Sequence, residues 1–236
     1  MKVLLIILLL FTCDVYAKID PKVYIPPQAY EYIPIIKKEV SQIFPDFPYP
    51  FYFGALIEHE SCVSLLNKKC WNPSSELKTK RERGIGFGQV TIAYRDNGDV
   101  RFDTLTDLVK KHRDYLKDLS WNNIIDRPDL QIRAIILLYK DNYKHPAISR
   151  VPRIQRLAMA DSAYNGGMRD VIKSRTVCGM TYNCDPNNWF NNVENNNVKS
   201  TRKLYGNRSA RDINNHHVRD VILVRSTKYI YAFRKY

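Results

Sequence analysis

The most apolar helical stretch of the sequence lies between residues 128 and 139. After Pro128, the run AIILLY (134–139) leaves no polar face, and a proline is favoured in the first turn of a helix. A helix that is apolar nearly all round has to be covered on every side. We therefore expect the rest of the chain to pack around this helix, which becomes the central buried element.

Apolar residues recur at helical spacing in several further segments, and prolines or glycines bound most of them. The additional helices that we expect cover residues 28–44, 51–61, 104–116, 152–167 and 218–233. Glycines alternate at positions 84, 86 and 88, and the turn sequence DNGD follows at 96–99. The sequence therefore predicts an α+β fold that is mostly α-helical, with a small β element near residues 80–105.

The N-terminus has the pattern of a secretion signal. Met1-Lys2 precedes nine apolar residues, and small residues follow at Val15 and Ala17. The apolar run is shorter than the roughly 20 residues of a transmembrane helix. We expect a cleavable signal peptide over residues 1–17, an extended, proline-rich arm over 18–27, and one domain over 28–236. A buried helix, an uncleaved anchor or lipid attachment at Cys13 are the alternatives.

Removal of residues 1–17 leaves four of the five cysteines: Cys62, Cys70, Cys178 and Cys184. An even number in a secreted chain indicates two disulfides, and proximity in sequence favours Cys62–Cys70 and Cys178–Cys184 among the three possible pairings. Free thiols in a reducing compartment are the alternative. We expect no zinc site, because no C-x-x-C pair is present. The protein is thus expected to be secreted or periplasmic.

The formal net charge of +13 indicates an anionic partner, such as nucleic acid, an acidic membrane surface or a bacterial cell wall. Basic residues are frequent in the C-terminal third: Lys199, Arg202, Lys203, Arg208, Arg211, Arg219 and Arg225. The simplest function of these cations is long-range attraction to an anionic cell envelope. A solvated face without a function is an equally open interpretation.

Two carboxylates lie at the end of the predicted helix 51–61. Glu60 follows an apolar run, and an apolar setting allows a carboxyl group to hold its proton at a higher pH, as a glycan-cleaving acid must. Glu58 lies two residues earlier, about 200° away around a helix. One of the two should therefore face a groove and the other solvent, and periodicity alone does not decide which.

Three motifs in a fixed order resolve this choice. Glu60-Ser61 is followed by GIGFGQ (84–89) and later by AYNGG (163–167). This order resembles the soluble lytic transglycosylase family, whose members carry a Glu-Ser pair, a Gly-Leu-Met-Gln-like segment and an Ala-Tyr-Asn-Ala/Gly-Gly segment. The resemblance covers roughly residues 48–167, and ELKT (76–79) is similar to bacteriophage wall-degrading members. The second motif departs from the family in reading Phe-Gly-Gln.

The resemblance implies a lysozyme-like α+β fold and cleavage of peptidoglycan between N-acetylmuramic acid and N-acetylglucosamine, with a 1,6-anhydro product. It also implies that Glu60 is the catalytic acid and base, that Gln89 lies in the substrate groove, and that Tyr164 and Asn165 line the catalytic subsite. Ser61 is expected to hydrogen-bond substrate or Glu60. The expected partners are glycan strands and the anionic envelope, without a cofactor, a specific nucleic acid or a second subunit.

Two other functions remain open. A goose-type muramidase would need a second carboxylate to activate water, and Asp96, Asp99 and Asp103 follow Gln89. A basic, disulfide-stapled protein could instead bind wall polymer or nucleic acid without catalysis.

The histidines are not expected to bind a metal. The segment Glu58-His59-Glu60 lacks the second histidine of a metalloprotease motif, so we expect no metal there. We expect His59 at the surface or rim of the site, and His216-His217 on a solvated face.

Overall fold

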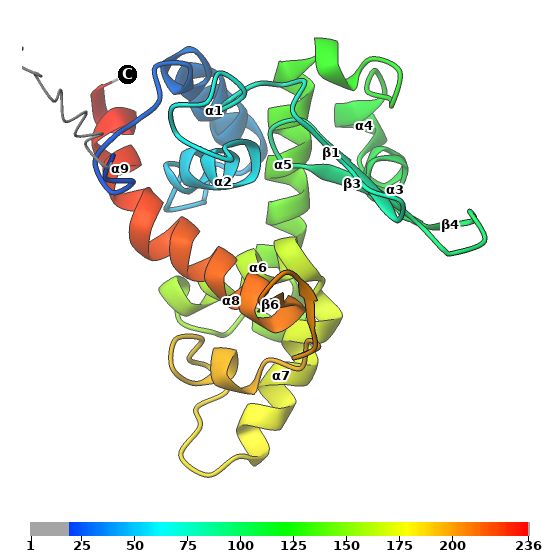
Figure 1. Cartoon of the computed structure of the whole chain (residues 1–236). Helices are drawn as coiled ribbons and strands as arrows, with labels where there is room; N and C mark the ends of the chain where they lie inside the picture. Colours follow the sequence, from blue (N-terminus) through cyan, green and yellow to red (C-terminus); the bar gives the residue numbers. More distant parts are fainter. Residues whose placement is uncertain (1–18, 236) are drawn as a thin grey trace, which may run out of the picture.

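Helix α5 (Pro128–Tyr143) lies centrally among the helices of the fold and packs against α1, α4 and α6 (Figure 1). In the computed structural model, which describes residues 19–235, Pro128 is the first residue of this helix and Asp129 follows in the first turn. Most of its apolar side chains are buried, which confirms the predicted central helix. The predicted signal peptide lies outside the described residues.

Seven of the remaining α-helices are at least eight residues long and one is shorter. Their bounds are α1 (Ala29–Ile43), α2 (Tyr52–Ser61), α3 (Thr104–Lys111), α4 (Arg113–Leu116), α6 (Arg153–Gly166), α7 (Met168–Met180), α8 (Ala210–Arg219) and α9 (Ser226–Lys235). Short 3-10 turns are η1 (Ile124–Asp126), η2 (Pro146–Ile148) and η3 (Val193–Asn196), and η4 (Asp220–Arg225) is a π-helical segment. Since η4 joins α8 directly to α9, these three elements form one continuous rod (Figure 1), which we call the C-terminal rod.

A small antiparallel sheet follows α2 in the sequence. Its strands lie in the order β1-β2-β3-β4, with bounds β1 (Glu76–Lys78), β2 (Glu82–Ile85), β3 (Val90–Tyr94) and β4 (Val100–Asp103). Ile85 pairs with Val90, so the turn between β2 and β3 consists of residues 86–89. Gly86 adopts a positive φ of 79° in this turn, a conformation that favours glycine. A two-stranded ribbon, β5 (Lys203–Tyr205) with β6 (Arg208–Ser209), precedes α8.

These elements confirm the predicted α+β class with its small sheet, which begins slightly before the expected residues 80–105. Likeness to the lysozyme fold remains a prediction. The core is rich in aromatic rings where α1, α2 and α5 meet. Phe47 lies at its centre, with ring centroids 4.7 Å from Phe44, 5.4 Å from Phe53 and 5.6 Å from Tyr139. This packing fixes α2, which carries Glu58 and Glu60, against the central helix.

Two helix predictions were wrong in their bounds. The expected helix 104–116 is broken at His112, whose backbone leaves the helical region at φ −116° and ψ 45°. The Nε2 atom of His112 lies 2.8 Å from the carboxylate of Asp141 in α5, which anchors the break to the central helix. The expected helix 218–233 begins eight residues earlier, at Ala210, because Ser209 and Asp212 form a capping box there.

The four cysteines of the described chain form the two disulfides that sequence proximity favoured, Cys62–Cys70 and Cys178–Cys184. Disulfides are typical of an oxidising compartment. The arm before α1 lies against the C-terminal rod, since Nζ of Lys228 donates to the carbonyl of Tyr24 at 2.6 Å. Between residues 19 and 235, no helix has the length and apolar character that crossing a bilayer requires.

Candidate functional site

The last turn of α2 is bound to the C-terminal rod. Three consecutive residues of α2, Glu58, His59 and Glu60, each contact a different level of the rod. Glu60 reaches α8, His59 reaches the start of η4, and Glu58 reaches the junction of η4 and α9. Figure 1 shows the rod crossing beside α2 and continuing toward α6. Segments that are far apart in the sequence therefore build this site together.

Glu60 ends a chain of hydrogen bonds that runs into the protein interior. Its Oε1 atom lies 2.8 Å from Nε2 of His217, and Nδ1 of His217 lies 2.7 Å from Oδ2 of Asp161. The hydroxyl of Tyr52 donates to Oδ1 of Asp161. The side chain of Glu60 is 15% exposed, whereas His217 is 2% exposed and Asp161 fully buried. Glu60 is thus the member of this chain that a ligand can reach.

The two carboxylates keep the imidazole of His217 positively charged. Burial by itself lowers the pKa of a histidine. Here the charge of Asp161, with the hydrogen bonds to Asp161 and Glu60, outweighs burial and raises the pKa of His217 to about 10. Both ring nitrogens then carry a proton, and each donates to one carboxylate. At neutral pH a buried cation therefore lies directly behind Glu60.

Local sequence signals place these side chains. The capping box of Ser209 and Asp212 fixes the start of α8, and His217 lies two turns further on the buried side. Helix α6 carries Asp161 and ends at Gly166, and the next residue, Gly167, has a φ of 89° that favours glycine. At the end of α2, the hydroxyl of Ser61 accepts from the backbone N–H of Trp71 at 3.2 Å. This bond and the Cys62–Cys70 disulfide fold the following segment back onto the helix end.

The predicted solvent position of the second carboxylate was wrong. Glu58 is fully buried, with its Oε1 atom 2.7 Å from Nη1 of Arg225 and 2.6 Å from Nζ of Lys228. The hydroxyl of Tyr229 donates to Oε2 at 2.7 Å. All three donors come from the C-terminal rod, so Glu58 is an internal ion-pair anchor. The choice of Glu60 as the accessible carboxylate is consistent with this burial.

The expected solvated face at His216-His217 was wrong for His217, and it describes only His216. His59 is 19% exposed in its side chain, which agrees with a rim position, but its Nδ1 atom lies 2.6 Å from Asp220. Burial alone would raise the pKa of Asp220, yet hydrogen bonds from His59 and Arg225 hold it well below its usual value. The ring of His59 also packs at 4.4 Å against that of His217.

Tyr164 connects the turn 86–89 with the surroundings of the Glu60–His217–Asp161 hydrogen-bond chain. Its hydroxyl donates to the carbonyl of Gly88 at 2.9 Å. Burial raises the pKa of this hydroxyl well above 10, and the charges of Glu60 and Asp161 raise it further. Tyr164 is therefore protonated at all ordinary pH values and close enough to Glu60 to sense its charge. Tyr164 thus links the turn 86–89, through the carbonyl of Gly88, to the electrostatic surroundings of Glu60 and Asp161.

Gly88→Ala should disrupt this junction. A Cβ at Gly88 would lie 2.4 Å from the Tyr164 hydroxyl and 2.5 Å from Cγ1 of Ile135, closer than real contacts allow. We expect a loss of about 1–3 kcal/mol in the free energy of unfolding, as for overpacked cores. Urea denaturation measures this loss. Gly179→Ala is the matched control, because its nearest neighbour lies 3.7 Å away; an equal loss in both variants would contradict the argument.

Other predicted site residues have contacts within the protein. Gln89 folds back onto its own turn, where Nε2 donates to the carbonyls of Gly86 at 2.9 Å and Ser75 at 3.3 Å. Ser61 is buried and donates to the carbonyl of Ile57 at 2.7 Å. Asn165 is exposed at the end of α6 and accepts from Asn214 at 2.9 Å. Contacts of Gln89, Ser61 and Asn165 with substrate remain predictions.

The carboxylates considered for a muramidase lie elsewhere. Asp96 and Asp99 belong to the turn between β3 and β4, which points away from α2 in Figure 1. Asp103 caps α3 and accepts from Thr106 and from the indole of Trp121 at 3.0 Å. In the described part of the chain, no group of three or more His, Cys, Asp or Glu side chains is arranged to hold a metal ion.

Part of the basic C-terminal third serves internal contacts. Arg225 pairs with Glu58 and Asp220, Arg219 with Glu194 at 2.5 Å, and Lys199 with Asp170 at 2.9 Å. These three cations therefore stabilise the fold and contribute less to long-range attraction than the sequence suggested.

His217 and Asp161 are the site residues that sequence reasoning missed. Asp161 interrupts the run LAMADSA (157–163) at the centre of α6, and a charged residue within a run of apolar and small residues requires a buried partner. That signal could have identified Asp161. Nothing local distinguishes His217 from His216, because only the packing of α8 against α6 separates them.

No protein-family model, curated protein or solved structure matches this chain.

Proposed function

We propose that this chain is a secreted peptidoglycan lytic transglycosylase of the bacteriolytic, endolysin-like kind. It would cleave the bond between N-acetylmuramic acid and N-acetylglucosamine and form a 1,6-anhydro product. The observation that carries the proposal is the setting of Glu60. This carboxylate is accessible and ends a buried hydrogen-bond chain, and its charge acts on Tyr164, whose hydroxyl binds the glycine turn that the family motifs contain. The lysozyme-like fold belongs to this proposal.

The reaction needs one carboxyl group that first gives and then takes a proton. Protonated Glu60 donates to the glycosidic oxygen as the bond from that oxygen to the anomeric carbon breaks. The Glu60 carboxylate then accepts the proton of the muramic acid 6-hydroxyl, whose oxygen bonds to the same anomeric carbon. Glu60 is restored, and no water is consumed. Because the substrate supplies its own nucleophile, proximity replaces a second catalytic carboxylate.

The residues behind Glu60 act on the state between the two steps. The imidazolium of His217 stabilises the carboxylate that exists between them, and Asp161 keeps the ring charged and oriented. The Oε2 atom of Glu60 has no hydrogen-bond partner within residues 19–235, so it is available to substrate. Asp161 is fully buried and therefore cannot activate water as the base of a hydrolase would.

Product chemistry tests the proposal. Purified peptidoglycan is digested with the protein, and the released muropeptides are analysed by mass spectrometry. The transglycosylase gives anhydro ends, whose mass is lower by one water than that of the reducing ends that a muramidase gives. Reducing ends alone would replace the proposed reaction with hydrolysis. Sedimentation of the protein with uncleaved wall would instead indicate a binding protein.

A further inference from the structure

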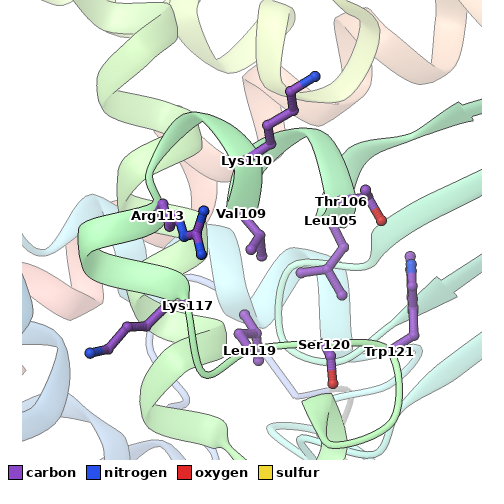
Figure 2. Close-up of a pocket in the computed structure, with 9 residues that line it drawn as sticks. All are labelled: Leu105, Thr106, Val109, Lys110, Arg113, Lys117, Leu119, Ser120 and Trp121. Carbon is purple, nitrogen blue, oxygen red and sulfur yellow. The ribbon is translucent and has the colours of Figure 1, made fainter.

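A cleft of about 520 Å³ lies between α3, α4 and the segment that follows them (Figure 2). Helix α5 separates it from α2 in Figure 1, so it is distinct from the candidate site at Glu60. The break at His112 creates it, because α4 turns away from the axis of α3 and leaves a wedge between the two helices. The contact of His112 with Asp141 holds that wedge open.

The floor and one wall of the cleft are apolar. Leu105 and Leu119 form the floor and are 1% and 3% exposed, and the partly buried Val109 also lines the cleft. Trp121 forms the wall, and its indole N–H donates to both carboxylate oxygens of Asp103, at 3.1 and 3.0 Å. These bonds fix the orientation of the partly exposed ring. Figure 2 shows Trp121 at one end of the cleft with Leu105 beside it, and Leu119 further along.

Three cations line the rim: Lys110, Arg113 and Lys117. Lys110 comes from α3, Arg113 opens α4, and Lys117 follows the end of α4. Within residues 19–235 none of the three forms an ion pair, whereas the adjacent Lys111 pairs with Asp141 at 2.8 Å. Figure 2 shows the guanidinium of Arg113 beside Val109, with the two lysines extending outward at the edge. Like charges so placed favour a bound anion.

We infer that this cleft binds an acidic saccharide, meaning a sugar unit that carries a phosphate or a carboxylate. The indole face and aliphatic floor suit the apolar face of a sugar ring. The hydroxyl of Ser120, which also lines the cleft, can bind a sugar hydroxyl. Arg113 provides the planar donor set that binds phosphate or carboxylate with two hydrogen bonds. A neutral sugar would leave the rim charges unpaired, and an inorganic anion would leave the apolar floor in water.

This inference goes beyond the proposed function and can be tested without it. The protein has three tryptophans, and Trp71 and Trp189 are 1% and 0% exposed, so quenching by acrylamide reports mainly on Trp121. Glucose 6-phosphate, glucuronate, glucose and inorganic phosphate are titrated separately. We expect at least one of the two acidic sugars to protect Trp121 from quenching. We expect glucose and phosphate to bind about tenfold more weakly, which is the effect of losing one charge-assisted hydrogen bond.

Arg113→Gln should weaken the binding of the acidic sugar by about tenfold, because it also removes one charge-assisted hydrogen bond. Lys173→Gln removes an exposed cation of α7 and is the charge-matched control, which should leave the affinity unchanged. Circular dichroism verifies that both variants are folded. The inference would be overturned if glucose or phosphate bound as tightly as the acidic sugars, or if neither acidic sugar protected Trp121. An unaltered affinity in Arg113→Gln would also overturn it. None of these outcomes concerns wall cleavage, so the function proposed for Glu60 stands or falls separately.

Discussion

Glu60→Gln should abolish wall lysis while the protein stays folded. The amide has nearly the shape of the carboxyl group, but it can neither give nor accept the proton that glycan cleavage requires. We expect the rate to fall at least about a thousandfold, within the range known for loss of a general acid. The decrease in turbidity of a peptidoglycan suspension measures the rate. Near-normal lysis by this variant would remove Glu60 from the mechanism.

Glu58→Gln is the matched control, because it makes the same chemical change two residues away in the same helix. It should leave Lys228 without a counter-charge in the interior and Arg225 with Asp220 alone. Breaking a buried ion pair in this way typically costs about 3–5 kcal/mol, which corresponds to a decrease of roughly 10 °C in melting temperature for a chain of this size. Calorimetry should therefore show the greater loss of stability in Glu58→Gln. The opposite ranking would mean that the two carboxylates are wrongly assigned.

The stability of the protein should decline as the pH rises from about 6.5 toward 10. The pKa of His217 is about 10 in the folded chain and near 6.5 in a histidine without partners. Because the pKa is higher in the folded chain, protonation of His217 stabilises the fold fully at pH values below the unfolded pKa. This stabilisation is lost as the pH rises toward the folded pKa. Between these values, His217 alone should lower the free energy of unfolding by about 1.4 kcal/mol per pH unit. Urea denaturation at several pH values measures the slope.

Asp161→Asn should flatten this slope. Asp161 and Glu60 are the carboxylates that contact His217, and Asp161 is the main cause of its raised pKa. The variant should be much less stable than the native protein at pH 6.5 and closer to it at pH 9. His216→Gln is the control, because its exposed ring lies outside the hydrogen-bond chain. A slope unchanged by Asp161→Asn would show that Asp161 does not hold the charge on His217.

The sequence contains enough information to predict the elements that depend on local signals. Pro128 and the apolar run behind it identify α5, Gly167 identifies the end of α6, and close spacing identifies both disulfides. Motif order also groups Glu60 with Tyr164, and the structure places the charge of Glu60 near that hydroxyl. These features are local in the chain or follow from the order of motifs, so they can be predicted from periodicity or from resemblance to a family.

The features that the sequence did not predict depend on distant partners. His217 lies in the polar run NNHHVRD, where neighbours suggest solvent, and α6 and α2 bury it. Helix α7 was not predicted, since Thr176, Val177 and Cys178 disfavour a helix and a glycine stop directly precedes it. Its packing against α6 outweighs that weak propensity. In both cases tertiary contacts, and not the local sequence, determine the structure.

The C-terminal rod has a consequence for how the site comes into being during synthesis. Glu60 and His217 are 157 residues apart in the chain, and Glu58 is 171 residues from Tyr229. A nascent chain that has emerged as far as residue 200 holds the carboxylate and the glycine turn, but neither the imidazolium nor the three donors that bind Glu58. Long-range contacts of this kind form late in folding. We therefore expect the proposed wall-cleaving centre to be inactive in an unfinished chain and to become active only when the rod docks onto α2.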